Sequence, residues 1–308
     1  MLVVEHQNVI LDRLERVSRL IGRTPLHYFE SLSSDKVKIF AKLEYQQFSG
    51  SVKARAAFQI IKTAVTQEQL GEGKRLLDAT SGNTGIAYAS IAAAAGIPVT
   101  LALPENASKK RKLILKGLGA QILYTSPFEG TDGAQKVSKE LYQSDPDLYY
   151  YADQYTNENN YLAHYYGTAQ EIWRQTKGTI THFVAGLGTT GTFVGTVSKL
   201  KALQTDLQAI ALQPDSPMHG LEGWKHLETA VVPKIFQSKL VDAYIPINTS
   251  DAFEFISRIS RKEGLLLSPS AAANLLGAYQ LALTLDEGVI VTTLADDSSK
   301  YDEIFDHL

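Results

Sequence analysis

The sequence predicts an α/β protein in which mostly parallel sheets are covered on both faces by helices. Short apolar segments alternate with helix-forming segments along most of the 308 residues, and this alternation is typical of parallel strands joined by helices. Two turns rich in glycine and threonine, residues 80–85 and 186–192, each lie between a strand-like and a helix-like segment. A chain of this length can bury a substantial core, so we expect one unit built of two lobes.

The N-terminal arm predicts an amphipathic helix. Leu11, Leu14, Val17 and the pair Leu20-Ile21 recur at helical spacing, which places them on one face of a helix. We expect this face to pack on a neighbouring element or on a second subunit.

Lys53 lies where a helix is expected to begin. It follows the small residues Ser49-Gly50-Ser51 and precedes a helix-forming run over residues 54–64. The positive end of a helix dipole disfavours an ammonium, which helps a lysine act as a neutral nucleophile. Lysines that form Schiff bases with a cofactor aldehyde need this environment. Most lysines at helix starts are solvated surface residues, so this segment alone does not decide between the two interpretations.

The first turn indicates an anion site. Residues 75–79 predict a strand, residues 86–95 an alanine-rich helix and residues 98–103 the next strand. The polar loop Thr80-Ser81-Gly82-Asn83-Thr84-Gly85 therefore lies over a helix N-terminus, where backbone N–H groups bind anions. An ordinary helix cap is the alternative. A run of six glycine and polar residues between a strand and a helix nevertheless favours a functional loop.

The second turn has the same character. A strand over residues 181–185 leads into Gly186-Leu187-Gly188-Thr189-Thr190-Gly191-Thr192, and a helix is expected over 193–203. Glycines let a backbone approach an anion closely, and threonine hydroxyls add donors. The turn also satisfies the dinucleotide fingerprint G-x-G-x-x-G, which requires an acidic residue at the end of the next strand. Asp215 follows that strand (207–212) and a proline, so a nicotinamide enzyme is the minor alternative.

Composition excludes several classes of protein. A net charge of −3 and a pI near 6.2 imply no affinity for nucleic acid or anionic membranes. The absence of cysteine excludes disulfides and thiolate sites and agrees with a cytoplasmic protein. The seven histidines show no ligand spacing, so we expect no metal.

The N-terminus has no signal-peptide pattern. The uncharged residues 86–104 are interrupted by Gly96-Ile97-Pro98, which indicates a buried helix and strand, not a membrane span.

Taken together, these motifs resemble the pyridoxal-phosphate enzymes of fold type II, specifically the cysteine synthase and cystathionine β-synthase family. The segments that match the family in order and spacing are Ile21-Gly-Arg-Thr-Pro-Leu26, Lys42-Leu-Glu44, Ser49-Gly-Ser-Val-Lys-Ala-Arg55, Thr80–Gly85, Gly188–Thr192 and Glu263-Gly-Leu-Leu-Leu-Ser268. The Gly-Thr-Thr-Gly-Thr form of the second turn, with 232–236 and 240–242 downstream, is most similar to the cysteine synthase B branch.

The resemblance implies a two-lobe fold similar to that of the tryptophan synthase β subunit, each lobe being a mostly parallel sheet flanked by helices. Residues 42–152 would form the smaller lobe, which carries the loop for the substrate carboxylate. Residues 1–41 and 153–308 would form the larger lobe, which carries the loop for the cofactor phosphate. Asp145-Pro146-Asp147 is the clearest local break before the chain returns.

The resemblance also assigns roles to individual residues. Lys53 would bind pyridoxal 5′-phosphate covalently and act as the catalytic base. Asn83 would contact the phenolic oxygen of the cofactor, and Ser268 its ring nitrogen. The residues that would bind the cofactor phosphate are Gly188, Thr189, Thr190, Gly191 and Thr192. Those that would bind the substrate are Thr80, Ser81, Gly82, Thr84, Gln154 and Lys225. Gln154 would close the site from the other lobe, and His226 would assist Lys225.

The implied reaction replaces the β-substituent of O-acetylserine or O-phosphoserine with sulfide to give L-cysteine, in a homodimer. A neutral serine at the ring nitrogen does not hold the ring protonated, which favours β-elimination over transamination. Three residues depart from the family pattern, namely Phe48, Ala54 and Pro269, and they leave the substrate open. The alternatives are cystathionine or 2,3-diaminopropionate synthesis, a serine or threonine dehydratase, an NAD-dependent oxidoreductase and a non-catalytic partner protein on this scaffold.

Overall fold

The computed structural model describes residues 2–80, 82–301 and 304. The chain divides into two compact units. Unit 1 comprises Met1–Ile21, Gln47–Ser49 and Lys53–Asn160, and unit 2 comprises Gly22–Gln46, Gly50–Val52 and Tyr161–Leu308. The N-terminal residues thus belong to unit 1, whereas the expected smaller lobe began at residue 42.

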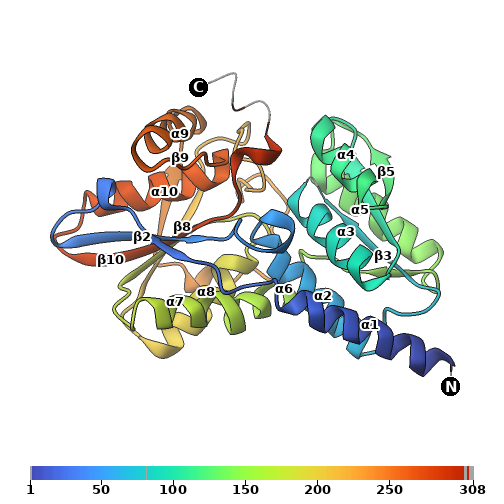
Figure 1. The fold of residues 1–308 in the computed structure, drawn as a ribbon. Helices are drawn as coiled ribbons and strands as arrows, with labels where there is room; N and C mark the ends of the chain where they lie inside the picture. Colours follow the sequence, from blue (N-terminus) through green and yellow to red (C-terminus); the bar gives the residue numbers. More distant parts are fainter. Residues whose placement is uncertain (1, 81, 302–303, 305–308) are drawn as a thin grey trace. The chain divides into compact units, whose positions relative to one another are not determined.

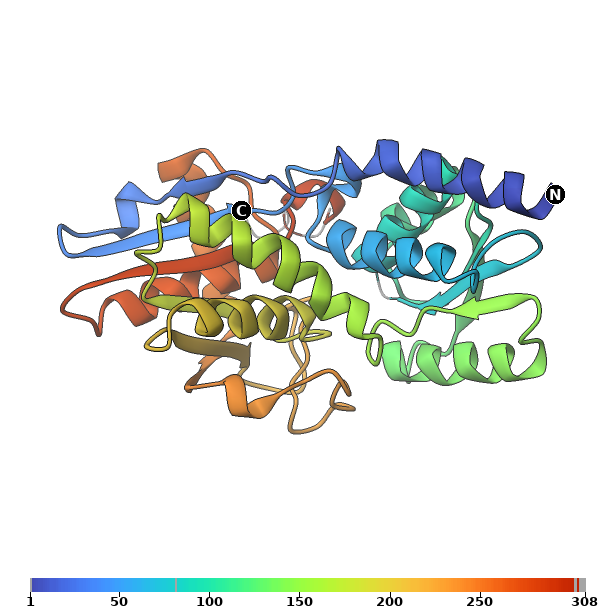
Figure 2. The same ribbon diagram turned by 90° about the horizontal axis from the view of Figure 1, so that it is seen from below.

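Unit 1 is built on a four-stranded parallel sheet in the order β5-β4-β3-β6. Its strands are β3 (Arg75–Ala79), β4 (Val99–Pro104), β5 (Gln121–Thr125) and β6 (Tyr149–Tyr151). Its helices are α1 (Leu2–Ser18), α2 (Lys53–Thr66), α3 (Asn83–Ala95), α4 (Lys109–Gly117) and α5 (Gly130–Ser144), and α6 (Glu158–Ala163) continues into unit 2. Figure 2 shows α5, in green, on the opposite face of the sheet from the blue helices α1 and α2. Because both faces are covered, β4 is buried along its whole length.

Helix α1 confirms the amphipathic pattern of the N-terminal arm. Ile10, Leu14 and Val17 are buried in one cluster with side chains of α2 and α3. The apolar face of α1 is therefore covered by neighbouring elements of unit 1, the first of the two possibilities that the pattern allowed. This face gives no support to a second subunit.

Unit 2 is built on a six-stranded sheet in the order β1-β2-β10-β7-β8-β9, in which β1 alone runs antiparallel to its neighbour. Its strands are β1 (Leu26–Tyr28), β2 (Val37–Leu43), β7 (His182–Gly186), β8 (Gln208–Pro214), β9 (Ala243–Ile247) and β10 (Gly288–Leu294). Its helices are α7 (Ala169–Gln175), α8 (Gly191–Leu203), α9 (Thr249–Glu263) and α10 (Pro269–Ala282), with a π-helical turn at His164–Thr168. Helices α9 and α10 cover one face of the sheet, and α7 and α8 cover the other (Figure 1).

Each predicted turn follows the carboxyl end of an internal strand of its sheet. The structure confirms the strands predicted over 75–79, 98–103, 181–185 and 207–212 to within two residues at each end. β3 leads into the loop before α3, and β7 leads into the loop before α8. In α/β proteins ligands bind outside the carboxyl ends of parallel strands, so both turns occupy the position expected of binding loops. Among the described residues no helix combines the length and apolar character that crossing a membrane requires.

Candidate functional site

The loop after β3 is folded tightly around the hydroxyl of Thr80. Thr80 Oγ1 accepts the N–H groups of Gly82 (3.1 Å) and Gly85 (3.0 Å). A Cβ atom on Gly85 would lie 2.5 Å from the methyl carbon of Thr80, so this turn requires a glycine. Asn83 is the first residue of α3, and the loop thus lies at a helix N-terminus, where N–H groups bind anions. Ser81, which the sequence assigns to the substrate, lies outside the described residues.

Gln154 closes this loop from the segment that follows β6. The Thr84 hydroxyl donates to Gln154 Oε1 (2.8 Å), and Gln154 Nε2 donates to the Ala79 carbonyl (2.9 Å). The structure therefore brings together Thr80, Thr84 and Gln154, three residues that the sequence assigned to one carboxylate site. Gln154 belongs to the same unit as the loop, whereas the sequence placed it on the other lobe.

Lys53 is the first residue of α2, so the helix start predicted there is confirmed. The turn before it uses left-handed backbone at Ser49 (φ 65°) and Gly50 (φ 66°). Two bonds within unit 2 hold the end of this turn: Lys300 Nζ donates to the Gly50 carbonyl (2.6 Å), and the Val52 N–H donates to the Ala295 carbonyl (2.8 Å). The backbone that leads into Lys53 is therefore fixed.

The loop between β7 and α8 has the features of a phosphate cradle. Thr190 adopts left-handed backbone (φ 69°) immediately before α8. Its hydroxyl is buried and has no hydrogen-bond partner within the described part of the chain. A buried donor of this kind at a helix N-terminus suits a ligand oxygen. The residues present therefore fit the phosphate group of a cofactor.

A second loop, residues 220–226, lies directly on this cradle. A Cβ atom on Gly188 would lie 1.9 Å from the Gly223 carbonyl oxygen, and one on Gly186 would lie 2.0 Å from the Trp224 ring. The Lys225 N–H donates to the Leu187 carbonyl (2.8 Å). Both glycines are thus required by close packing, and Lys225, which the sequence assigned to the substrate, lies next to the cradle.

Ser268, which the sequence assigns to a ring nitrogen, is the N-cap of α10. Its hydroxyl accepts the Ala271 N–H (3.2 Å) and donates to the buried carboxylate of Asp296. A hydroxyl has one proton to donate, and here it goes to Asp296. The hydroxyl of Ser270 lies 3.4 Å away. Sequence reasoning missed Ser270 and Asp296; the repeated serine in Ser268-Pro269-Ser270 was the available signal for the first.

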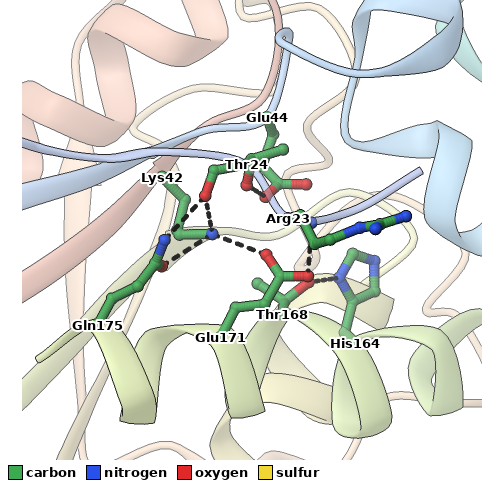
Figure 3. A network of polar contacts seen from close by, with 8 residues as sticks. All are labelled: Arg23, Thr24, Lys42, Glu44, His164, Thr168, Glu171 and Gln175. Atoms are coloured by element: carbon green, nitrogen blue, oxygen red, sulfur yellow. Dashed lines mark hydrogen bonds and ion pairs between the residues drawn. The ribbon is translucent and has the colours of Figure 1, made fainter. Parts of the chain in front are cut away.

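A buried polar network lies on the face of the unit 2 sheet that α7 and α8 cover (Figure 3). Lys42, fully buried on β2, forms an ion pair with Glu171 of α7 (2.8 Å) and donates to the Thr24 carbonyl (2.6 Å). Nearby, His164 bonds Thr168 through Nδ1 (2.9 Å), and its Nε2 lies 3.3 Å from the hydroxyl of Thr192. His164 thus connects the π-helical turn with the cradle. The histidine spacing gave no indication of this contact, because the two residues are 28 positions apart.

The dinucleotide alternative finds no support in the geometry of Asp215. Its carboxylate accepts a hydrogen bond from the Asn248 side chain (2.8 Å), and Asn248 caps α9. Across the described residues, no cluster of three or more histidine, aspartate and glutamate side chains could hold a metal ion.

Comparisons with known proteins agree with this geometry. The family model for "Pyridoxal-phosphate dependent enzyme" matches residues 17–296. A cysteine synthase from Aquifex aeolicus is 44% identical over 306 residues, covering 96% of this chain and 93% of that protein. A cysteine synthase B from Salmonella typhimurium is 34% identical and covers 94% of each. The crystal structure of a cysteine synthase from Entamoeba histolytica superposes with a TM-score of 0.88 at 30% identity, over 94% of this chain and 90% of that one.

Proposed function

The chain belongs to the family of pyridoxal-phosphate dependent enzymes, and we propose that it is a cysteine synthase. It would replace the β-substituent of O-acetylserine or O-phosphoserine with sulfide and release L-cysteine and acetate or phosphate. The observation that carries this proposal is the buried Thr190 hydroxyl at the start of α8, which would bind the cofactor phosphate together with the helix N-terminus. The relatives named cysteine synthase, at 34–44% identity over nearly the whole chain, support the reaction.

The residues of this chain would divide the work as follows. Bound pyridoxal phosphate supplies an aldehyde for the substrate amine and a ring that accepts electrons from Cα. Lys53 would hold the cofactor and then remove the Cα proton as general base. The Thr80–Gly85 loop, with Gln154, would bind the substrate carboxylate. Asn83 would contact the phenolic oxygen of the cofactor, and residues 188–192 its phosphate.

Ser268 and Ser270 would together face the ring nitrogen. Because the Ser268 proton is donated to Asp296, we assign the direct contact to Ser270, with Ser268 holding the start of α10. Ser270→Ala should change the visible absorbance of the cofactor and leave the free energy of unfolding nearly unchanged. Ser268→Ala should lower the free energy of unfolding by about 1 kcal/mol, because it removes a helix cap. Unchanged absorbance in Ser270→Ala would refute the direct contact.

The proposed function is tested by a spectrum recorded without sulfide. The purified protein is expected to be yellow, and O-acetylserine or O-phosphoserine should change its visible absorbance as the leaving group departs. Adding sulfide should then restore the starting spectrum. If neither ester changes the spectrum, β-replacement on these donors is wrong, and cystathionine or 2,3-diaminopropionate synthesis, a dehydratase or a non-catalytic role must be considered. An NAD-dependent oxidoreductase would have no such colour.

Lys225 provides a test of the leaving group. Its backbone N–H bonds the Leu187 carbonyl beside the cradle, and we propose that its ammonium contacts the leaving group of a phosphorylated donor. A charge-assisted contact with phosphate is worth about 1.5–3 kcal/mol, or about ten- to a hundredfold in affinity. Lys225→Ala should therefore lower kcat/KM for O-phosphoserine by that factor and leave O-acetylserine nearly unchanged.

Lys234, exposed on the same connection between β8 and β9, is the matched control, and Lys234→Ala should change neither value. Equal losses on both donors in Lys225→Ala would show that Lys225 does not read the leaving phosphate.

We also propose a homodimer in the cytoplasm, with one site in each subunit. The resemblance to the cysteine synthase group supports it. Light scattering should give about twice the 33.8 kDa mass of one chain at micromolar concentration, and a value near one chain would refute the dimer.

A further inference from the structure

Asp78 is a fully buried carboxyl at the root of the Thr80–Gly85 loop. It is the next-to-last residue of β3, an internal strand of the unit 1 sheet. Its Oδ1 accepts the N–H of Ala79 (2.8 Å), and its Oδ2 accepts the N–H of Gln154 (3.3 Å). The two oxygens thus join the residue that enters the loop to the residue that closes it.

Gln154 is held by four hydrogen bonds, and Asp78 receives the one from its backbone N–H. The side-chain amide bonds Thr84 and the Ala79 carbonyl, and the backbone carbonyl accepts Asn160 Nδ2 (2.7 Å). Asp78, Gln154 and Thr84 therefore form a chain of contacts across the base of the loop. Removing the carboxylate would free the backbone of Gln154 to shift, and its side chain would shift with it.

This arrangement is costly to the fold, because its surroundings disfavour a charged carboxyl. Burial, with the nearby charge of Asp153, raises the pKa of Asp78 from 3.8 to about 7, although the two N–H bonds oppose the shift. The other titratable groups on which its charge acts are Tyr88 on α3, Tyr150 and Tyr151 on β6, and Tyr155 after β6. The charge of Asp132 on α5 acts on Tyr155 in turn. A buried group with a perturbed pKa beside a binding loop is a frequent mark of a functional site.

We propose that Asp78 is a positioning residue of the substrate-carboxylate site, an inference that rests on the proposed function. Its ionised carboxylate holds Gln154 against the Thr80–Gly85 loop, and the site is complete in that form. In a protonated carboxyl one oxygen carries the proton and accepts hydrogen bonds only weakly, so the bond from Gln154 or from Ala79 is weakened. Affinity for the amino-acid substrate should therefore rise as the pH increases through about 7.

The test compares KM for O-acetylserine between pH 6 and 8.5 in the unmodified holoenzyme and in Asp78→Asn. The amide keeps the shape of the side chain but cannot offer two acceptors. We expect KM to rise about ten- to a hundredfold at pH 8, the value of a hydrogen bond to a charged group, with kcat changed less than twofold. The fall of KM with pH should disappear in the variant.

Two further variants separate positioning from other effects. Asp153→Asn removes a neighbouring negative charge without touching either N–H bond, so the pH dependence should persist with its midpoint moved to lower pH. In a Gln154→Ala background, Asp78→Asn should add almost nothing, because Asp78 acts through Gln154. Additive effects of the two substitutions would overturn the proposal, as would an unchanged pH profile in Asp78→Asn.

The free energy of unfolding distinguishes a positioning role from a structural one. A residue that only stabilised the fold would make the protein less stable when substituted, whereas Asp78→Asn is expected to make it more stable at pH 8. The pKa of Asp78 is higher in the folded protein than in the unfolded chain. The free energy of unfolding therefore falls progressively as the pH rises from about 4 to about 7 and Asp78 ionises. Asp78→Asn should therefore unfold at higher urea concentration than the unmodified protein at pH 8, and the difference should shrink toward pH 4. A variant less stable at pH 8 overturns the proposal. If the unmodified protein turns over neither ester, the proposed function fails instead.

Discussion

Lys53→Ala is expected to lower kcat for cysteine formation by about 10²–10⁴-fold, the usual contribution of a general base. The variant also loses the group that would hold the cofactor covalently, so borohydride treatment should attach no cofactor to it. In the unmodified protein the same treatment followed by peptide mapping should place the label on Lys53. Lys53 begins α2 directly after a turn whose end is fixed by Lys300 and Ala295, which is the rigid setting that a catalytic amine needs.

Lys62 is the matched control, because it is an exposed lysine on the same helix. Lys62→Ala should keep kcat and the label unchanged. A label on any other lysine, or full activity in Lys53→Ala, would contradict the role of Lys53.

Gly188→Ala is expected to disrupt the phosphate cradle. The added Cβ atom would lie 1.9 Å from the Gly223 carbonyl oxygen, and a backbone atom cannot move aside as a flexible side chain can. Overpacking of this kind costs about 1–3 kcal/mol, so urea unfolding should show a loss of that size or more. Because the 186–192 loop or the 220–226 loop must shift, affinity for pyridoxal phosphate, measured by absorbance titration, should fall at least about tenfold, the equivalent of 1.4 kcal/mol.

Gly117→Ala is the control, since a Cβ atom there meets nothing within 4 Å and alanine is favoured in a helix. It should leave cofactor affinity unchanged and the fold at least as stable. Normal affinity in Gly188→Ala would show that this loop does not bind the phosphate.

The parts of the fold that the sequence predicted are those with strong local signals. The strand–loop–helix units around Thr80–Gly85 and Gly186–Thr192 were recognisable because apolar strands, glycine-rich turns and alanine-rich helices follow one another directly. Helix α3 begins at Asn83, three residues before the predicted start, because the polar residues 83–85 already belong to its first turn. The family membership that these motifs indicated is confirmed by the matching family model.

What the sequence could not predict depends on contacts between distant residues. The packing of Trp224 on Gly186 explains why that position is a glycine, yet nothing local in either segment indicates the contact. Asp78 resembles a lone polar residue in an apolar strand until the N–H of Gln154, 76 positions away, is seen on its carboxylate. The roles assigned to Lys53, Asn83 and the cradle residues toward cofactor and substrate stay predictions.

The most direct measurement of the central claim is cysteine formation by the unmodified protein, loaded with pyridoxal phosphate, with O-acetylserine and O-phosphoserine assayed side by side. The product is quantified by a colour reaction specific for cysteine, with and without sulfide. We predict cysteine formation from at least one ester that depends on sulfide, and the ratio of the two kcat/KM values identifies the leaving group. Failure of both esters to give cysteine above the rate without protein would contradict the proposed function.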